Sequence, residues 1–234
     1  MTEHAKSLNV IAAAVAGLVW ADPASAQPVR QLTVVELFQS QGCSDCPPAN
    51  ANLIALSDRP DLLTLSFGVT YWDQLGWKDT FASPQFTARQ WDYARAFGRS
   101  EVFTPEVVVN GRSDIVGGNR AELEALIERE TRKDAPAITY DNGSVGIGPG
   151  QGSGAVWLVR YDPDVVQVPI SRGENEGRTL PHKDVVRQLL RLGDWSGRAT
   201  QFHTLPSPDP RWKDAVLVER SQGGEIIAAG KLPS

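Results

Sequence analysis

The chain has 234 residues, a length that suits one large domain or two small ones. Apolar residues make up 41% of it and charged residues 22%, a balance typical of globular proteins that excludes wholesale disorder. The formal net charge of −5 offers no clustered positive surface for nucleic acid. We therefore expect a folded protein without a nucleic-acid partner.

The first 26 residues have the pattern of a secretory leader. Lys6 precedes an apolar run over residues 8–20, and the tripeptide Ala24-Ser25-Ala26 is typical of a cleavage site. The run is shorter than the roughly 20 residues that a membrane-spanning helix needs. An uncleaved N-terminal anchor is the alternative. We expect a signal peptide over 1–26, a mature chain without a membrane span, and a periplasmic or secreted location.

Strand and helix patterns alternate through the first half of the mature chain. Strands are predicted over 32–38, 62–69 and 106–109, and helices over about 49–56, 84–97 and 121–131. Asn110-Gly111 indicates a hairpin whose return strand covers 112–116. A β-α-β crossover needs parallel strands, whereas the hairpin needs antiparallel ones. The sequence therefore predicts an α/β domain over 27–134, with a mixed sheet flanked by helices.

The sequence pattern changes at residue 135, after which glycines and prolines recur at short intervals. The strand-like runs are 155–161, 165–170, 184–190 and 215–219. About eight short strands separated by turn signals are typical of a small β-sandwich or barrel. Residues 184–192 also fit the period of a helix. We predict a second, β-rich, sandwich-like domain over 135–234.

Cys43 and Cys46 are the only cysteines. A disulfide across a two-residue spacer removes little entropy from the unfolded chain, so the pair is better suited to chemistry than to stabilisation. It follows a predicted strand and opens a helix, where free amide groups and the helix dipole favour a thiolate at Cys43. Cys46 is then placed to resolve a mixed disulfide, and we expect the charge of Asp45 to oppose thiolate formation. An inert local disulfide is the alternative.

Two resemblances follow from these motifs. The strand, the C-x-x-C helix and the later Thr104-Pro105 before a strand resemble the thioredoxin-like superfamily, which implies a cis Pro105 facing the dithiol, with Thr104 beside it presenting backbone to a substrate. The segments that resemble the exported bacterial domain-of-unknown-function-1223 family are 34–49, 71–77, 103–105 and 172–175. This second resemblance covers most of the mature chain and supports the fold more than the function. With the thioredoxin-like resemblance, the dithiol gives Cys43, Cys46 and Pro105 as the expected catalytic set. The aromatic-Cys-Gly-Pro-Cys site of thioredoxin itself is absent.

Further side chains are candidates for a supporting role. Trp72, Asp73 and Trp77 lie in a dense aromatic loop that could line a substrate groove, although core packing explains tryptophans equally well. Glu36, in the strand before the dithiol, is a possible proton acceptor for Cys46. Strand alternation offers the opposite interpretation, in which its side chain points away from the sulfurs.

Metal and cofactor chemistry has less support in the sequence. His182 and His203 could join the two cysteines in a copper or zinc site, but they lack ligand spacing. Pro47, and not a histidine, follows Cys46, which excludes the usual haem attachment, and there is no P-loop. We expect neither a metal nor a cofactor.

The sequence thus favours an exported thiol-disulfide oxidoreductase whose partners are exported protein thiols or a redox partner protein. Two alternatives stay open. One is a non-enzymatic binding or scaffold protein with a structural disulfide, and the other is a copper-handling protein. The oligomeric state is left open.

Overall fold

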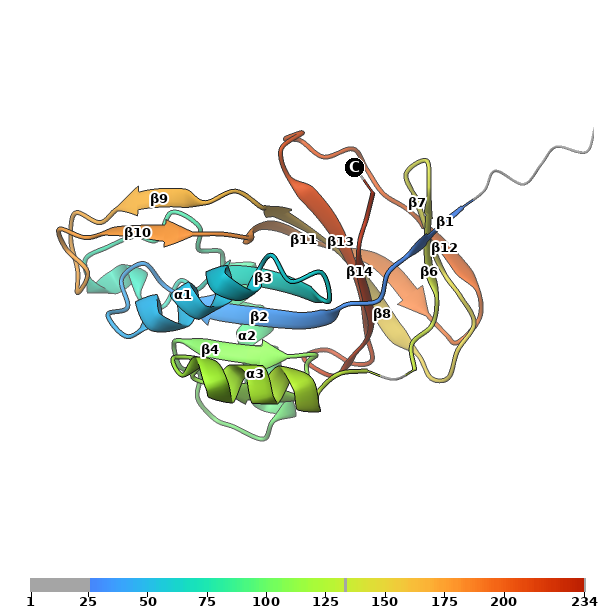
Figure 1. Ribbon diagram of the computed structural model, residues 1–234, viewed down its shortest axis with the longest axis horizontal. Coiled ribbons are helices and arrows are strands. Elements are labelled where there is room, and N and C mark those ends of the chain that lie inside the picture. The colour runs from blue at the N-terminus through green and yellow to red at the C-terminus, as the bar shows by residue number, and fades with distance from the viewer. Residues whose placement is uncertain (1–25, 133, 234) are drawn as a thin grey trace, which may run out of the picture.

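The computed structural model describes residues 26–132 and 134–233 (Figure 1). The leader predicted over 1–26 lies outside the described residues, apart from Ala26. The α-helices are α1 (Cys46–Leu56), α2 (Pro84–Ala96) and α3 (Arg120–Arg129), and η1 (Asp73–Leu75) is a short 3-10 helix. The strands before residue 133 are β1 (Gln27–Val29), β2 (Thr33–Gln39), β3 (Leu62–Gly68), β4 (Glu106–Val109) and β5 (Ser113–Ile115). The later strands are β6 (Ile138–Asp141), β7 (Ser144–Ile147), β8 (Gly154–Asp162), β9 (Val166–Pro169), β10 (Thr179–His182), β11 (Val185–Trp195), β12 (Thr200–His203), β13 (Lys213–Glu219) and β14 (Ile226–Lys231).

One eight-stranded sheet dominates the molecule, in the order β14-β13-β8-β11-β3-β2-β4-β5. Strands β2 and β3 are parallel, and so are β3 and β11, while the other neighbours are antiparallel. The pairing between β11 and β3 joins Val185 to Ser66. Strands from both halves of the sequence therefore form one continuous sheet.

The predicted fold class, an α/β thioredoxin-like domain followed by a β-rich sandwich-like domain, is wrong. The described residues form fourteen strands and only three α-helices, in large mixed and antiparallel sheets. The prediction failed because it treated the sheet of the first half as complete. Hydrophobic patterns indicate which residues are buried, but they do not say which strand pairs with a free sheet edge. Here β11 takes the edge of β3 and extends the sheet. The division into domains at residue 134 stays a prediction.

Helices cover both faces of the sheet around β2. On one face α1 and α3 pack over Val35, Leu37 and Val107. On the other face α2 packs with Val34, Phe38 and Val108. The alternation along β2 matches the two-residue period of a strand that is buried on both sides.

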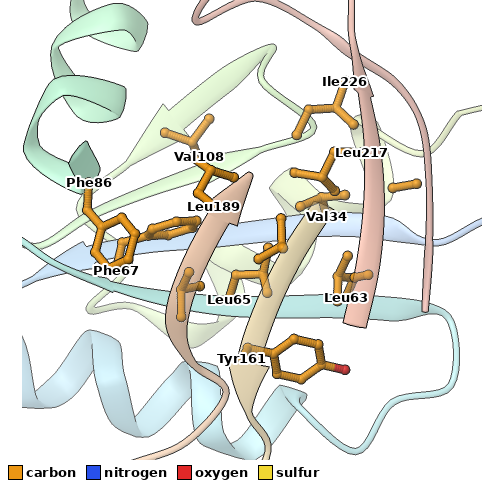
Figure 2. Packing of buried hydrophobic residues seen from close by; sticks show 14 of the residues in the cluster. Val34, Leu63, Leu65, Phe67, Phe86, Val108, Tyr161, Leu189, Leu217 and Ile226 are labelled. Atoms are coloured by element: carbon orange, nitrogen blue, oxygen red, sulfur yellow. The ribbon is translucent and has the colours of Figure 1, made fainter. Parts of the chain in front are cut away.

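The core on the α2 face joins the two halves of the chain, as Figure 2 shows. Val34, Leu65 and Phe86 from the first half lie in one cluster with Leu189 and Leu217 from the second. Fully burying one such side chain contributes roughly 1.5–3 kcal/mol relative to leaving it exposed. The two halves therefore stabilise each other.

A second sheet, in the order β1-β6-β7-β12, lies at the opposite end of the molecule from α1 (Figure 1). Its residues Ile138 and Val145 share a cluster with Leu158 and Val216 of the large sheet and with the fully buried Trp195. Of the segment 184–192, which fitted either a strand or a helix, residues 185–192 belong to the strand β11. Within the described residues, no helix is both long and apolar enough to cross a membrane.

Candidate active site: the dithiol at the start of α1

Strand β2 ends at Gln39. A tight turn that contains Cys43 follows, and α1 begins at Cys46. The Cys46 N–H donates to the carbonyl oxygen of Cys43 across 3.3 Å. Pro47 and Pro48 occupy the first helical turn. Proline is tolerated there because a backbone N–H in the first turn has no acceptor within the helix. Both cysteines are free thiols, and both are buried, with 0% of Cys43 and 2% of Cys46 exposed.

The two sulfurs have pKa values shifted in opposite directions. The pKa of Cys43 is lowered to about 7, chiefly because the Cys46 thiol hydrogen-bonds to it. Burial raises the pKa of Cys46 well above its usual range, and the neighbouring Cys43 raises it further. Asp45 contributes through its backbone N–H, which helps to lower the pKa of Cys43. The opposing effect expected of the Asp45 side-chain charge stays a prediction.

Thr104 and Pro105 lie against the dithiol, and the peptide bond between them is cis. The Cys43 Sγ is 3.8 Å from the carbonyl oxygen of Thr104. Trp72 donates its indole N–H to Thr104 Oγ1 across 2.7 Å. The structure thus brings together Cys43, Cys46, Thr104, Pro105 and Trp72.

Trp77 and Asp73 belong to the wall of this site, in different ways. Trp77 donates its indole N–H to the side-chain oxygen of Gln41, two residues before Cys43, across 2.9 Å. The Asp73 carboxylate accepts from the backbone N–H of Asp79 across 3.1 Å, so it shapes the loop after η1. Trp77 holds the dithiol turn directly, and Asp73 supports the loop that carries it.

Glu36 is not brought to the sulfurs. Its carboxylate accepts hydrogen bonds from Arg89 Nε across 2.8 Å and from the Tyr93 hydroxyl, both on α2. Arg89 also pairs with Glu219 at 3.2 Å, in a cluster that is almost completely buried. Because α2 covers the sheet face opposite α1, the side chain points away from the dithiol, and we do not propose it as the proton acceptor.

Sequence analysis missed the residues that tie the dithiol turn to the rest of the chain. Asp79 Oδ2 accepts from the Gln41 N–H across 2.7 Å, and burial raises the pKa of Asp79 to about 6. Asn175 donates to the carbonyl oxygens of Gln41, at 3.0 Å, and of Cys43, at 2.8 Å. Glu174 accepts from the Ser44 N–H across 3.0 Å. The family-like segment 172–175 drew attention to Glu174 and Asn175, but it did not indicate which distant residues they contact.

The two histidines of the described chain lie apart. His182 is buried beneath α1, with its Nδ1 3.4 Å from Gln39 Nε2, and burial lowers its pKa to about 4. His203 lies on β12 of the small sheet, against the hydroxyl of Ser144 at 3.0 Å. Over 26–132 and 134–233, no group of three or more His, Cys, Asp or Glu side chains is arranged to hold a metal ion.

Comparison with known families gives one match. The family described as "Protein of unknown function (DUF1223)" matches residues 34–219. The chain belongs to this family. The match spans the dithiol, the Thr104–Pro105 turn and the segment around Asn175, so the whole site lies within the region that defines the DUF1223 family.

Two solved structures are similar to this DUF1223 protein. One is a crystal structure of an Agrobacterium tumefaciens protein from a structural-genomics consortium, with 29% identity and a TM-score of 0.72 over 86% of this chain and 93% of that one. The other is HBP35 of Porphyromonas gingivalis, with 12% identity and a TM-score of 0.56 over 88% of this chain and 76% of that one, a likeness of fold alone. No curated protein sequence matches the chain. The thioredoxin-like superfamily is not confirmed, and none of these matches assigns an activity.

Proposed function

We propose that this DUF1223 protein is an exported thiol-disulfide oxidoreductase that acts on protein substrates through Cys43 and Cys46. The observation that carries the proposal is the asymmetry of the pair. The pKa of Cys43 is lowered to about 7, so roughly half of it is thiolate at neutral pH, while the pKa of Cys46 is raised. An attacking thiol works best when its pKa lies near the ambient pH, which fits Cys43 as the nucleophile, and Cys46 acts only after the mixed disulfide has formed.

The exchange has two balanced steps. The Cys43 thiolate attacks one sulfur of a substrate disulfide, a Cys43–substrate disulfide forms, and the second substrate sulfur leaves and takes up a proton. Cys46 then loses its proton and attacks Cys43 Sγ, which forms the Cys43–Cys46 disulfide and releases the first substrate sulfur as a thiol. The substrate gains two electrons and the dithiol loses two. The reverse sequence oxidises a substrate dithiol.

The neighbouring groups have defined parts in this scheme. The hydroxyl of Thr104 and the backbone N–H groups of Asp45 and Cys46 stabilise the Cys43 thiolate. Trp72 fixes the Thr104 hydroxyl. Thr104 and Pro105 provide the backbone that would lie along a bound polypeptide, next to the attacking sulfur.

Trapping of the mixed disulfide tests the proposal. Cys46→Ala should retain a covalent adduct with a disulfide-containing protein such as insulin, and Cys43→Ala should form none. A titration of the wild-type pair in glutathione buffers gives the reduction potential and so the direction of electron flow. If Cys46→Ala forms no adduct while its Cys43 still reacts with iodoacetamide, the protein is not an oxidoreductase of this kind.

The burial of both sulfurs favours a second candidate, a non-enzymatic binding protein whose disulfide is structural. It predicts a reduction potential below about −300 mV, as in structural disulfides of secreted proteins. It also predicts that Cys43→Ala and Cys46→Ala leave partner binding unchanged.

The exported location is part of the proposal, and the leader pattern over 1–26 supports it. Expression of the full chain in a Gram-negative bacterium should yield a periplasmic protein whose N-terminal residue is Gln27. A chain that keeps residue 1 and stays in the cytoplasm would contradict the proposed location.

A further inference from the structure

The hairpin formed by β9 and β10 reaches over the dithiol turn. The hairpin is a two-stranded sheet of its own, outside the large sheet, and in Figure 1 it lies beside α1. Its base is held to α1, where Asn50 donates to the carbonyl oxygen of Pro181 across 2.5 Å. Its tip, which we define as residues 171–177, carries the contacts to the turn between Gln41 and Ser44.

Asn175 is the only buried residue of that tip. It is 0% exposed, whereas Glu174 and Glu176 on either side are exposed. Its Nδ2 donates both hydrogens, one to the carbonyl oxygen of Gln41 and one to that of Cys43. Arg178 donates to Asn175 Oδ1 across 2.7 Å, which fixes the orientation of the amide. The amide nitrogen therefore holds the turn, and the amide oxygen is held by Arg178.

The fully buried Cys43 cannot meet a protein disulfide in this arrangement. Sulfur exchange requires an approach to bonding distance, about 2 Å, and 0% of Cys43 is exposed. At least one segment around the sulfur must therefore move before a macromolecular substrate can react.

The tip is the segment with the weakest attachment. Thr104 and Pro105 run directly into the fully buried strand β4, and Trp77 is held by Gln41. The tip, by contrast, contains Gly173 and Gly177 on either side of Asn175, both in the left-handed region with φ of +82° and +79°. Most of its residues are exposed, and segments with few buried contacts open at the lowest free-energy cost.

We infer that the tip of the β9–β10 hairpin is a cap on the dithiol, in which Asn175 is a positioning residue that a polypeptide substrate displaces. Opening the cap frees the carbonyl oxygens of Gln41 and Cys43. Backbone N–H groups of an extended substrate segment can then replace the two donors of Asn175. The substrate class this favours is an unfolded or flexible polypeptide with an accessible disulfide. The inference rests on the proposed function for its substrate, but the cap itself is testable without any substrate.

Alkylation of Cys43 in the fully reduced protein measures the cap directly. The probe is iodoacetamide at pH 9, above the Cys43 pKa of about 7, so that changes in the thiolate fraction contribute little. Asn175→Ala should raise the rate at least tenfold, and Arg178→Met should give a smaller increase because it only releases the orientation of the amide. Glu176→Ala, an exposed change on the same tip, is the matched control and should leave the rate unchanged.

Hydrogen exchange of the wild-type protein provides a readout that needs no variant. The N–H of Ile170 and the N–H of Gly177 are bonded across the tip, at 2.8 and 2.9 Å, and should exchange faster than those of β4. Equal alkylation rates for wild type and Asn175→Ala, or tip amides as protected as those of β4, overturn the cap. Failure of the proposed function looks different, because Cys43 then alkylates faster in Asn175→Ala while no protein adduct forms in any variant.

Discussion

Trp72 donates its indole N–H to the hydroxyl oxygen of Thr104 across 2.7 Å, and this same hydroxyl group lowers the pKa values of both Cys43 and Cys46. Since the oxygen accepts from the indole, the hydroxyl hydrogen is left to face the sulfurs. Trp72 lies 29 residues after Cys43 and 32 residues before Thr104 in the sequence. The contact exists because the loop after β3 folds back over the dithiol turn. Trp72 thus acts on the thiols through Thr104.

The first prediction concerns the effect of the Thr104 hydroxyl on the pKa of Cys43. Thr104→Val should raise the pKa of Cys43 from about 7 to about 8, because a hydrogen bond to a charged group contributes roughly 1.5 kcal/mol and one pKa unit corresponds to 1.36 kcal/mol. Trp72→Phe should raise it by less, since the hydroxyl remains but is free to rotate. The pH profile of the rate of iodoacetamide alkylation gives the midpoint. Thr104→Ser keeps the hydroxyl and is the control, and a midpoint that moves equally in Thr104→Ser would refute the role of the hydroxyl.

The second prediction separates the contribution of Cys46. Its thiol is the largest cause of the low pKa of Cys43, so Cys46→Ala should move the Cys43 midpoint from about 7 upward toward the ordinary value of 9.0. Cys46→Ser, which keeps a hydrogen-bond donor at the same place, should move it less. The same alkylation profile reports both variants. If the midpoint of Cys46→Ala stays at about 7, the helix terminus and not the second sulfur sets the acidity of Cys43.

Local features of the fold could be predicted from the sequence. The strands around residues 33–39, 62–68 and 106–109 and all three helices lie within a few residues of their predicted bounds. Asn110-Gly111 forms the expected turn, with both residues in the left-handed region, at φ of 49° and 64°. These features depend on residues close together in the sequence, which is why a single sequence reveals them.

Long-range pairings could not be predicted in the same way. The parallel contact between β11 and β3 rests on Val185 and Ser66, neither of which differs in kind from dozens of other strand residues. Within the site, the C-x-x-C motif and Thr104-Pro105 were visible because their residue types are chemically distinctive. Asn175 was not, because an asparagine between two glutamates in a Gly-flanked turn has the composition of an ordinary exposed loop.

The third prediction tests the buried ion cluster on the α2 face. Arg89→Met should cost about 3–5 kcal/mol of unfolding free energy, because it leaves the Glu36 and Glu219 carboxylates buried without their cation. Urea denaturation measures the loss. Arg120→Met breaks the exposed pair with Glu124 at 2.9 Å and should cost about 0.5 kcal/mol or less. Similar losses in the two variants would contradict the importance of burial.

The same cluster gives a fourth prediction, which concerns Glu36 as a proton acceptor for Cys46. Glu36→Gln should lower stability while leaving the pH midpoint of Cys43 alkylation unchanged, because Glu36 faces Arg89 and Tyr93 and not the sulfurs. Stability and alkylation are measured on the same preparation. A shift of the alkylation midpoint in Glu36→Gln would show that its charge reaches the dithiol after all.

The last prediction concerns acid stability and His182. Burial lowers its pKa to about 4 in the folded protein, against 6.5 when it is free. Between those values the unfolded chain binds the extra proton, so the stability linked to His182 is fully present above pH 6.5 and is lost as the pH falls toward 4.

His182→Gln should remove that dependence. The unfolding free energy of wild type minus that of the variant should fall by about 3 kcal/mol between pH 7 and pH 4, since each pKa unit corresponds to 1.36 kcal/mol. Asp79 and Asp184, whose pKa values burial raises to about 6, titrate in the same window, but they are present in both proteins and their contributions cancel in the difference. His203→Gln changes an exposed histidine and should reproduce the wild-type pH dependence. A constant difference between wild type and His182→Gln across this range would mean that His182 takes up its proton as readily in the folded protein as in the unfolded chain.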